Sequence, residues 1–344
     1  MMSSRPGAPE EPPAPDVLID MLLGEVSDPL LRLPILRAAL ELAVWAQIAE
    51  GHRTANEIAL AVGADPGGMR RLLDALTVMK LLVKEGDVYR LPDWGEHYLL
   101  PGRPAYLGDF VLEWLSWEGH GRLAEAIRTG QRPINPDVTH AKAVGHFLSF
   151  YAVRALAPRR YAQRYDGYWE SLQVEPREGL KVLELACGAG IAALALAQRH
   201  PGVRVVLQDW PAMLEIALEV AGKLGVEGQV TTLPGDMISV DCGQDQFDIA
   251  GLGFVTYFFG PDDLMKLFCT LFTALKPGGM LVLDAPLSDE GRCENVDAVL
   301  DGPWLYAISA QGDVYSFSDY KGLLERAGFG GVTQVDEGLV KAVR

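Results

Sequence analysis

The fold is decided by residues 180–196, which read Leu-Lys-Val-Leu-Glu-Leu-Ala-Cys-Gly-Ala-Gly-Ile-Ala-Ala-Leu-Ala-Leu. The mostly apolar run at residues 182–185 is typical of a strand buried on both faces, and residues 192–198 are good helix formers. Gly188 and Gly190 lie between them, where glycine permits a positive φ and lets a ligand approach the backbone. The N-terminus of the following helix adds unpaired N–H groups and a partial positive charge. The stretch therefore predicts a strand, a tight ligand-binding turn and a helix.

Two acidic positions further along give this turn its context. Asp209 follows the next apolar strand, Val203–Leu207, at about the spacing at which a carboxylate binds ribose hydroxyls in a βαβ nucleotide unit. Asp236 follows a third apolar run, Val230–Leu233. The glycines alone lack the full G-x-G-x-x-G pattern of a dinucleotide site. The complete set resembles the S-adenosylmethionine site of class I methyltransferases, and it comprises Glu184, Gly188, Gly190, Asp209 and Asp236.

The length and charge of the chain limit the number of domains and the classes of partner that it can have. Its 344 residues are too many for one typical domain and predict two, and a hydrophobic content of 49% is enough for packed cores. A net charge of −16 disfavours nucleic acid or an anionic membrane as partner, because both are bound through a basic face. No apolar run approaches the ~20 residues that span a bilayer, and the N-terminus has no basic region before an apolar core. We expect a cytoplasmic protein that binds neither nucleic acid nor membrane.

The four cysteines predict neither a metal site nor a disulfide framework. Cys187, Cys242, Cys269 and Cys293 show no C-x-x-C spacing and are too sparse for a framework. They fit a reducing compartment, and we expect them to be buried as small hydrophobic residues. No metal is expected.

The N-terminal part divides into a proline-rich lead and a helical domain. Residues 1–15 contain too much proline to fold alone and are predicted to be disordered. The domain that follows spans residues 16–105. Its predicted elements are three helices and an alternating hairpin, at residues 28–49, 54–62, 65–79 and 81–91.

Three helices followed by a small hairpin form the winged-helix plan, which many DNA-binding proteins share. Over residues 53–100, however, six lysines and arginines are matched by seven aspartates and glutamates. Such a balance makes no phosphate-binding surface, so the domain is predicted to serve packing or dimerisation. A winged-helix regulator stays the remote alternative.

The next part, residues 106–170, is helical and rich in aromatic side chains. Aromatic residues at helical spacing often form ordinary core, but this segment links the small domain to the nucleotide unit, and ligand sites favour clefts between domains. We expect it to line an acceptor pocket with residues from later loops. The predicted pocket residues are Trp114, Trp117, His120, Phe147, Tyr151, Arg154, Phe258 and Asp301.

Strands and helices alternate over residues 171–344, which is typical of a parallel sheet covered by helices on both faces. Helices are predicted at Pro261–Leu275 and Phe317–Ala327, with a turn at residues 276–279. The predicted strands are 181–185, 203–207, 230–233, 247–252, 280–284, 332–336 and 339–343.

The chain resembles the bacterial and plant small-molecule O-methyltransferases, the group that includes hydroxyneurosporene and acetylserotonin methyltransferases, over nearly its whole length. Besides the N-terminal domain, the matching segments lie at 184–190, 208–211, 235–237, 274–279, 312–317 and 327–329. The resemblance implies an α/β class I methyltransferase with a Rossmann-like seven-stranded sheet whose final strand pair is antiparallel. It also implies an N-terminal winged-helix dimerisation domain, a homodimer, and an acceptor pocket between the helical segment and the sheet.

The resemblance implies S-adenosylmethionine as cofactor, bound in three parts. The implied contacts are Gly188 and Gly190 with the methionine portion, Asp209 flanked by Gln208 and Trp210 with the ribose, and Asp236 with Met237 at the adenine. The chemistry agrees, because a carboxylate accepts from vicinal hydroxyls and a thioether offers an apolar wall to a purine.

The sequence departs from the family after the fourth strand of the sheet. There, family members usually carry a histidine that removes the acceptor's proton, whereas residues 254–262 read Phe-Val-Thr-Tyr-Phe-Phe-Gly-Pro-Asp. Tyr257 or Phe258 takes the place of the histidine. A phenol titrates near ~10 and is a poor base at neutral pH, so Tyr257 is predicted to orient the acceptor instead. Further candidates for handling the proton are His120, His146, Asp284 and Asp301.

Two enzymatic functions remain open. The first is O- or C-methylation of a small, activated aromatic or conjugated acceptor, such as a phenolate, an enolate or an electron-rich tetrapyrrole carbon, since transfer from a sulfonium depends largely on proximity and orientation. The second is a relative that binds S-adenosylmethionine but catalyses a cyclisation or a decarboxylation. The missing histidine does not separate them, and we predict the methyltransferase.

Overall fold

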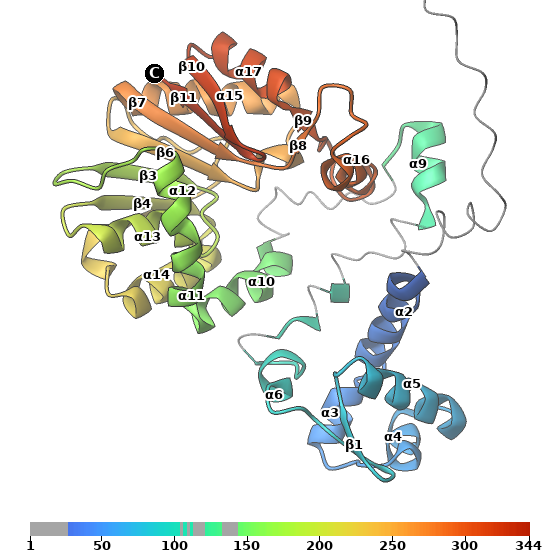
Figure 1. Ribbon diagram of the computed structural model, residues 1–344. Helices are drawn as coiled ribbons and strands as arrows, with labels where there is room; N and C mark the ends of the chain where they lie inside the picture. Colours follow the sequence, from blue (N-terminus) through green and yellow to red (C-terminus); the bar gives the residue numbers. More distant parts are fainter. Residues whose placement is uncertain (1–26, 104–105, 109–110, 113–120, 133–143) are drawn as a thin grey trace, which may run out of the picture. The chain divides into compact units, whose positions relative to one another are not determined.

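The computed structural model describes residues 27–103, 106–108, 111–112, 121–132 and 144–344 (Figure 1). The chain splits into two compact units, Met1–Leu112 and Glu113–Arg344. Among the helices of these described ranges, none is both long and apolar enough to cross a membrane.

The N-terminal unit consists of short helices and a hairpin around one core. Its elements are α2 (Ser27–Glu41), α3 (Val44–Ala49), α4 (Ala55–Val62), α5 (Pro66–Val78), β1 (Val83–Glu85), β2 (Val88–Arg90) and α6 (Gly95–Tyr98). Trp45, Ile58 and Leu73 are buried at its centre. α5 begins where the sequence predicts, because the Asp65 carboxylate accepts from the N–H of Gly68 and a proline occupies the first helical position.

The sequence predicts one helix over residues 28–49, and this prediction is wrong, since the structure has α2 and α3 instead. Ala43 lies between them in the left-handed region, with φ 49°. The break leaves Leu40 on one side and Val44 on the other buried in the same core. Neither glycine nor proline occupies the break, so the local sequence gives no signal for it. We attribute the break to the burial of both helices in one core.

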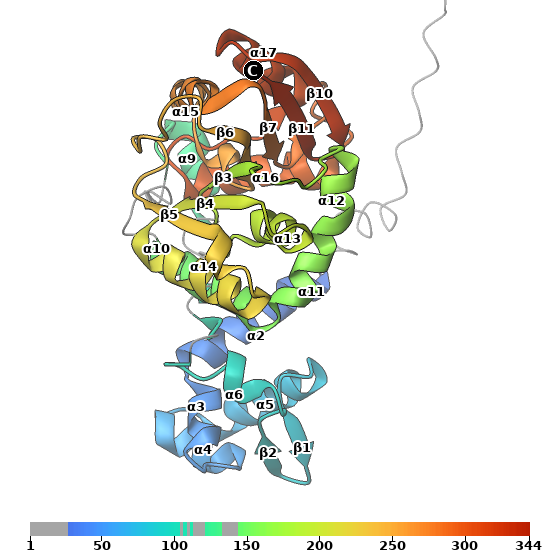
Figure 2. The ribbon, with the colours of Figure 1, turned by 90° about the vertical axis from the view of Figure 1, so that its left-hand side faces the viewer.

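The C-terminal unit is built on a seven-stranded sheet with the order β10-β11-β7-β6-β3-β4-β5 (Figures 1 and 2). The strands are β3 (Lys181–Leu185), β4 (Arg204–Asp209), β5 (Val230–Pro234), β6 (Phe247–Gly253), β7 (Leu275–Asp284), β10 (Gly330–Asp336) and β11 (Leu339–Val343). β11 is antiparallel to both β7 and β10, whereas the remaining pairs are parallel. The seven-stranded α/β sheet with its antiparallel final pair is thus confirmed.

β7 begins earlier than the sequence predicts. Residues 276–279 are expected to form a turn, yet they belong to the strand. The N–H of Gly278 donates to the carbonyl of Arg344, and the N–H of Arg344 donates to the carbonyl of Gly279, each at 2.9 Å. The end of the chain therefore supplies hydrogen-bond partners that a local sequence pattern does not reveal.

Helices cover both faces of the sheet (Figure 2). α13 (Ile191–Arg199) and α14 (Pro211–Leu224) pack on one face, with Val182 of β3. α15 (Pro261–Ala274) and α17 (Phe317–Arg326) pack on the other face, with Leu183 of β3. Successive residues of a strand point to opposite faces, so a central strand buried on both faces reads as a continuous apolar run.

The remaining elements of this unit lie before the sheet or between its strands. They are α9 (Leu123–Thr129), α10 (Val144–Leu156), α11 (Pro158–Ala162), η3 (Gln163–Tyr165), α12 (Asp166–Ser171), η4 (Glu227–Gln229), η5 (Thr256–Phe258), β8 (Leu287–Ser288), α16 (Val296–Ile308) and β9 (Tyr315–Ser316). The indole N–H of Trp169 in α12 donates to the carbonyl of Ala192 at 2.8 Å. This bond ties the helices before the sheet to the first turn of α13.

Candidate cofactor and acceptor site

The turn between β3 and α13 requires glycine at two positions for two different reasons. Gly188 and Gly190 both have left-handed backbones, with φ 54° and 67°. A Cβ at Gly188 would lie 2.3 Å from the ring of Tyr151, and a Cβ at Gly190 would lie 3.0 Å from Leu207 of β4. An aromatic ring thus closes on the first glycine, and the neighbouring strand closes on the second. Ala186 also has a positive φ of 47°, which is strained for a residue with a side chain.

Asp209, at the end of β4, holds this turn in place. Its carboxylate accepts from the N–H of Gly188 at 2.8 Å and from the N–H of Trp210 at 2.7 Å. Burial raises the pKa of Asp209 to about 6, although both N–H groups favour the ionised form. Each oxygen makes one of these bonds, and a carboxylate has about four acceptor positions. Asp209 can therefore hold the turn and still accept from the hydroxyls of a ligand.

Gln208 joins two turns at the same edge of the sheet. Its side-chain oxygen accepts from the N–H of Ala186 at 3.2 Å, and its side-chain nitrogen donates to the carbonyl of Gly235 at 2.6 Å. The turn after β3 and the turn after β5 are thereby held at a fixed separation. The resemblance implies that Gln208 lies beside the ribose, but the sequence gives no signal of this bridge, because both partners lie in turns after other strands.

Glu184 lies under the start of α13. Its carboxylate accepts from the N–H of Ala193 at 2.8 Å. Burial raises the pKa of Glu184 to about 7, and the negative charge of Asp209 acts in the same direction. Both acids near the turn therefore have raised pKa values, and a bound cation would stabilise the ionised form of each.

Asp236 and Met237 follow β5 and form the far end of the predicted cofactor site. The Asp236 carboxylate accepts from the N–H of Ile238 at 2.9 Å and so caps the turn that it begins. Met237 is 7% exposed and packs into the core that contains α15. The role of these two residues at the adenine stays a prediction.

α10 places aromatic side chains between the glycine turn and the segment after β6. Tyr151 contacts Gly188, and the ring of Phe147 meets that of Phe258 edge to face, with centroids 6.4 Å apart. The predicted cofactor turn and the predicted acceptor residues are thus joined through one helix. Arg154, predicted to line the pocket, places its guanidinium 4.1 Å from the ring centroid of Phe150 and 4.9 Å from that of Tyr151. It stacks on the aromatic rings of its own helix.

Two tyrosines that the sequence does not single out belong to the same region. The rings of Tyr165 and Tyr168 lie edge to face, with centroids 5.3 Å apart. Burial raises the pKa of Tyr165 to about 12, and the charges of Glu184 and Asp284 contribute. A Tyr-x-x-Tyr spacing on one helical face just before the sheet is the signal that could have found them.

Tyr257, Asp284 and Asp301 form the acidic side of the predicted acceptor site. Tyr257 lies in η5 directly after β6, and burial raises its pKa above the ordinary range, with the charges of Asp301 and Asp284 adding to the shift. Asp284 ends β7, and its carboxylate has no hydrogen-bond partner among the residues that the structure describes. Burial raises the pKa of Asp284 to about 6 and also raises that of Asp301, which is half-buried.

Several predicted residues fall outside the part of the chain that the structure describes. They are Trp114, Trp117 and His120, together with the side chain of His146. The expectation for the cysteines is wrong for two of the four, because Cys187 and Cys242 are buried but Cys269 and Cys293 are exposed. Cys269 lies on the outer side of amphipathic α15, and Cys293 lies in the loop before α16.

A mixed sheet in this order, with β11 antiparallel, a glycine turn after β3 and an acid at the end of β4, is the class I methyltransferase fold. A methyltransferase domain model matches residues 182–279, and an O-methyltransferase dimerisation domain model matches residues 28–100. The chain is an S-adenosylmethionine-dependent methyltransferase that is similar in both of its domains to small-molecule O-methyltransferases, as the resemblance of its motifs predicts.

Its relatives in sequence modify different atoms. The 3-hydroxy-5-methyl-1-naphthoate 3-O-methyltransferase of Streptomyces sahachiroi is 26% identical over 332 residues, covering 94% of this chain and 91% of that protein. The N,N-dimethyltransferase OxyT of Streptomyces rimosus is 25% identical over 313 residues, covering 86% of each chain. An O-methyltransferase family protein from Burkholderia thailandensis has the same fold, with a TM-score of 0.70, 20% identity, and coverage of 95% of this chain and 98% of that one.

Proposed function

We propose that this enzyme methylates an oxygen, nitrogen or carbon atom of a small aromatic or conjugated acceptor, and that it does so without the usual catalytic histidine after the fourth strand of the sheet. The observation that carries the proposal is the position of Tyr257, a phenol in η5 just after β6, where Gly253 at the end of β6 pairs with Asp284 at the end of β7. The contact of Phe147 with Phe258 supports a flat acceptor, because aromatic rings favour stacked or edge-to-face partners. The relatives that modify a naphthoate oxygen or carry out N,N-dimethylation support the range of acceptor atoms.

The residues around the glycine turn fit S-adenosylmethionine. When bound, the cofactor supplies an electrophilic methyl group on a positively charged sulfur. The carboxylates of Glu184 and Asp209 favour a cation, because a positive charge stabilises their ionised forms. Asp209 also keeps acceptor positions free for the ribose hydroxyls. Gly188 leaves room for the ring of Tyr151, which lies against the backbone of the turn.

Tyr257 and Asp284 have different roles toward the acceptor: the first orients it and the second takes its proton. Burial raises the pKa of Tyr257 above its usual range, so the phenol stays protonated at neutral pH and donates a hydrogen bond that orients the acceptor atom. Asp284 has a pKa of about 6 and is mostly ionised at pH 7. Its carboxylate makes no hydrogen bond to a described residue and is the group available to take the acceptor's proton. A pKa nearer to neutrality makes this carboxylate a stronger base than an ordinary aspartate.

We further propose that two copies of the chain associate through the N-terminal unit. The O-methyltransferase dimerisation model that matches residues 28–100 supports a homodimer. Large apolar side chains also face solvent in this unit, with Leu31, Leu60 and Val78 exposed by 64%, 85% and 77%. Burying such side chains against a second copy would be favourable.

The proposed function is tested with S-adenosylmethionine labelled in its methyl group. Purified protein is incubated with the labelled cofactor and a panel of phenols, naphthols, aromatic amines and enolisable diketones, and mass spectrometry then locates the label. We expect at least one acceptor to carry the label on oxygen, nitrogen or carbon. If calorimetry shows that the cofactor binds but the label stays on it with every acceptor, methyl transfer to this class is contradicted.

A further inference from the structure

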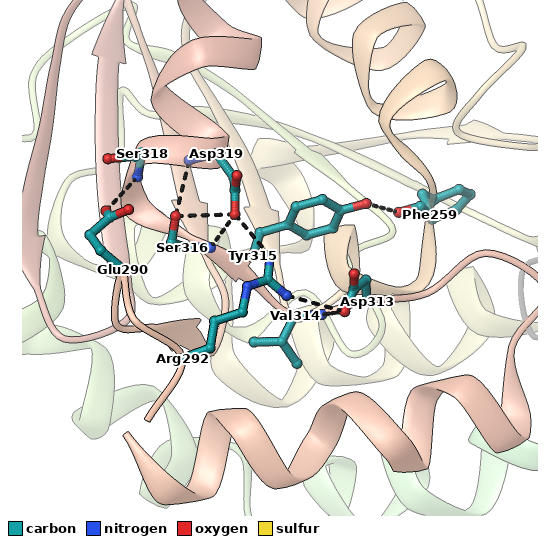
Figure 3. A network of polar contacts seen from close by, with 9 residues as sticks. All are labelled: Phe259, Glu290, Arg292, Asp313, Val314, Tyr315, Ser316, Ser318 and Asp319. Atoms are coloured by element: carbon teal, nitrogen blue, oxygen red, sulfur yellow. Dashed lines mark hydrogen bonds and ion pairs between the residues drawn. The ribbon is translucent and has the colours of Figure 1, made fainter. Parts of the chain in front are cut away.

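The segment that carries Tyr257 is held by a part of the chain far from it in sequence. The N–H of Asp313 donates to the carbonyl of Tyr257 at 3.0 Å. The hydroxyl of Tyr315 donates to the carbonyl of Phe259 at 2.7 Å, as Figure 3 shows. Residues 313–315 therefore fix the backbone on both sides of Phe258. We call the stretch from Ser309 to Tyr315 the C-terminal brace.

Arg132 holds the first turn of this brace. One guanidinium nitrogen, Nη1, donates to the carbonyl of Ser309 at 2.7 Å and lies 3.4 Å from the carbonyls of Leu305 and Gly312. The guanidinium also covers the ring of Tyr306, with 4.4 Å between Cζ and the ring centroid. Leu305 and Ser309 belong to the C-terminal end of α16, where carbonyl groups lack helical partners and a cation is favourable.

Little space separates this turn from Tyr257. The N–H of Gly312 donates to the hydroxyl of Ser309 at 2.9 Å. A Cβ at Gly312 would lie 2.3 Å from that hydroxyl and 2.8 Å from the carbonyl of Tyr257. A continuous series of contacts therefore leads from Arg132 through the Ser309–Gly312 turn to the Tyr257 backbone. A shift of the turn is therefore transmitted to the Tyr257 backbone, because the two are hydrogen-bonded through the Asp313 N–H and closely packed at Gly312.

We infer that Arg132 is a positioning residue for the acceptor site, because it holds the Ser309–Gly312 turn against the backbone of Tyr257 and so sets where the phenol meets the acceptor. The inference rests on the proposed role of Tyr257. Arg132 itself touches neither η5 nor the glycine turn in the contacts of the described residues. Among these contacts, those with Ser309 and Gly312 connect it to Tyr257 through the brace.

The first test needs no acceptor and uses hydrogen exchange on the full-length protein. Arg132→Met removes the donors but keeps an apolar stem, Arg132→Lys keeps the charge, and Arg128→Met on exposed α9 is the matched control. In Arg132→Met we expect exchange in peptides 254–260 and 309–316 to be about tenfold faster, with partial recovery in Arg132→Lys. Peptide 184–190 should not change. Unchanged exchange at 254–260, or equal acceleration in every peptide, would overturn the inference.

The second test measures turnover with an acceptor found in the labelling panel. We expect Arg132→Met to lower kcat by about tenfold to a hundredfold, because small misplacements of reacting groups have effects of this size. Affinity for S-adenosylhomocysteine should be unchanged. Gly312→Ala, whose added Cβ would lie 2.3 Å from the Ser309 hydroxyl and 2.8 Å from the Tyr257 carbonyl, should reproduce the loss, and Arg128→Met should not. Normal kcat in Arg132→Met would contradict the inference, whereas faster exchange in a protein that labels no acceptor would contradict only the proposed function.

Discussion

Replacing Gly188 by alanine is expected to destabilise the C-terminal unit by about 2–5 kcal/mol. Two effects add in this number. The left-handed backbone, with φ 54°, costs an alanine about 1–2 kcal/mol. The new methyl group would lie 2.3 Å from the ring of Tyr151, and such overpacking costs about 1–3 kcal/mol more.

A control and a second background separate the two effects. Gly179 has φ 74°, and a Cβ added there would meet no heavy atom within 4 Å, so Gly179→Ala should cost only the backbone term of about 1–2 kcal/mol. In a Tyr151→Ala background, Gly188→Ala should also fall to this value, which leaves a coupling energy of about 1–3 kcal/mol between the two sites. Equilibrium unfolding in guanidinium chloride, followed by circular dichroism, measures each term. If Gly188→Ala costs no more than Gly179→Ala, the ring of Tyr151 does not close on the turn.

Three further perturbations follow from the site. Tyr257→Phe should lower kcat by about tenfold to a hundredfold, the worth of one lost hydrogen bond to the acceptor, while calorimetry finds cofactor affinity unchanged; equal kcat would remove Tyr257 from the mechanism. Asp209→Ala should weaken cofactor binding by about tenfold or more in the same calorimetric assay. It removes the proposed hydrogen-bond acceptor for the ribose hydroxyls and the partner of the Gly188 N–H. Unaltered affinity would refute the assigned site. Burial raises the pKa of Glu184 from 4.5 to about 7, so the folded apo protein binds this proton more tightly than the unfolded chain does. The stabilisation is complete below pH ~4.5 and is lost as pH rises through ~7, by about 3 kcal/mol. Urea unfolding at several pH values should show this decline in the wild type and less of it in Glu184→Gln; identical slopes would contradict the raised pKa.

Strand ends and glycine positions show how far local patterns reach. β3 and β11 have the predicted bounds, because apolar runs and the turns that flank them are local signals. Gly188 and Gly190 have the positive φ that their place in the pattern implies. The break at Ala43 and the early start of β7 are different, since each depends on residues that are distant in sequence.

The candidate site shows the same division. The sequence names Gly188, Asp209 and Tyr257, because residue type and spacing after a strand carry that information. It does not reveal that Tyr151 closes on Gly188, or that Arg132 reaches Tyr257 through the C-terminal brace. These contacts join elements that are far apart in the sequence, and their positions along the chain do not predict that they are close in the folded protein.

By itself, the sequence determined the sheet, the glycine turn after its central strand and the absence of the usual histidine from residues 254–262. Only the tertiary structure decided the protonation of the site, since the pKa values of Glu184, Asp284 and Tyr257 are raised by the protein packed around them. The physical reason is that strand and turn formation follows from short-range backbone and hydrophobic preferences, whereas desolvation depends on every element that excludes water from a group.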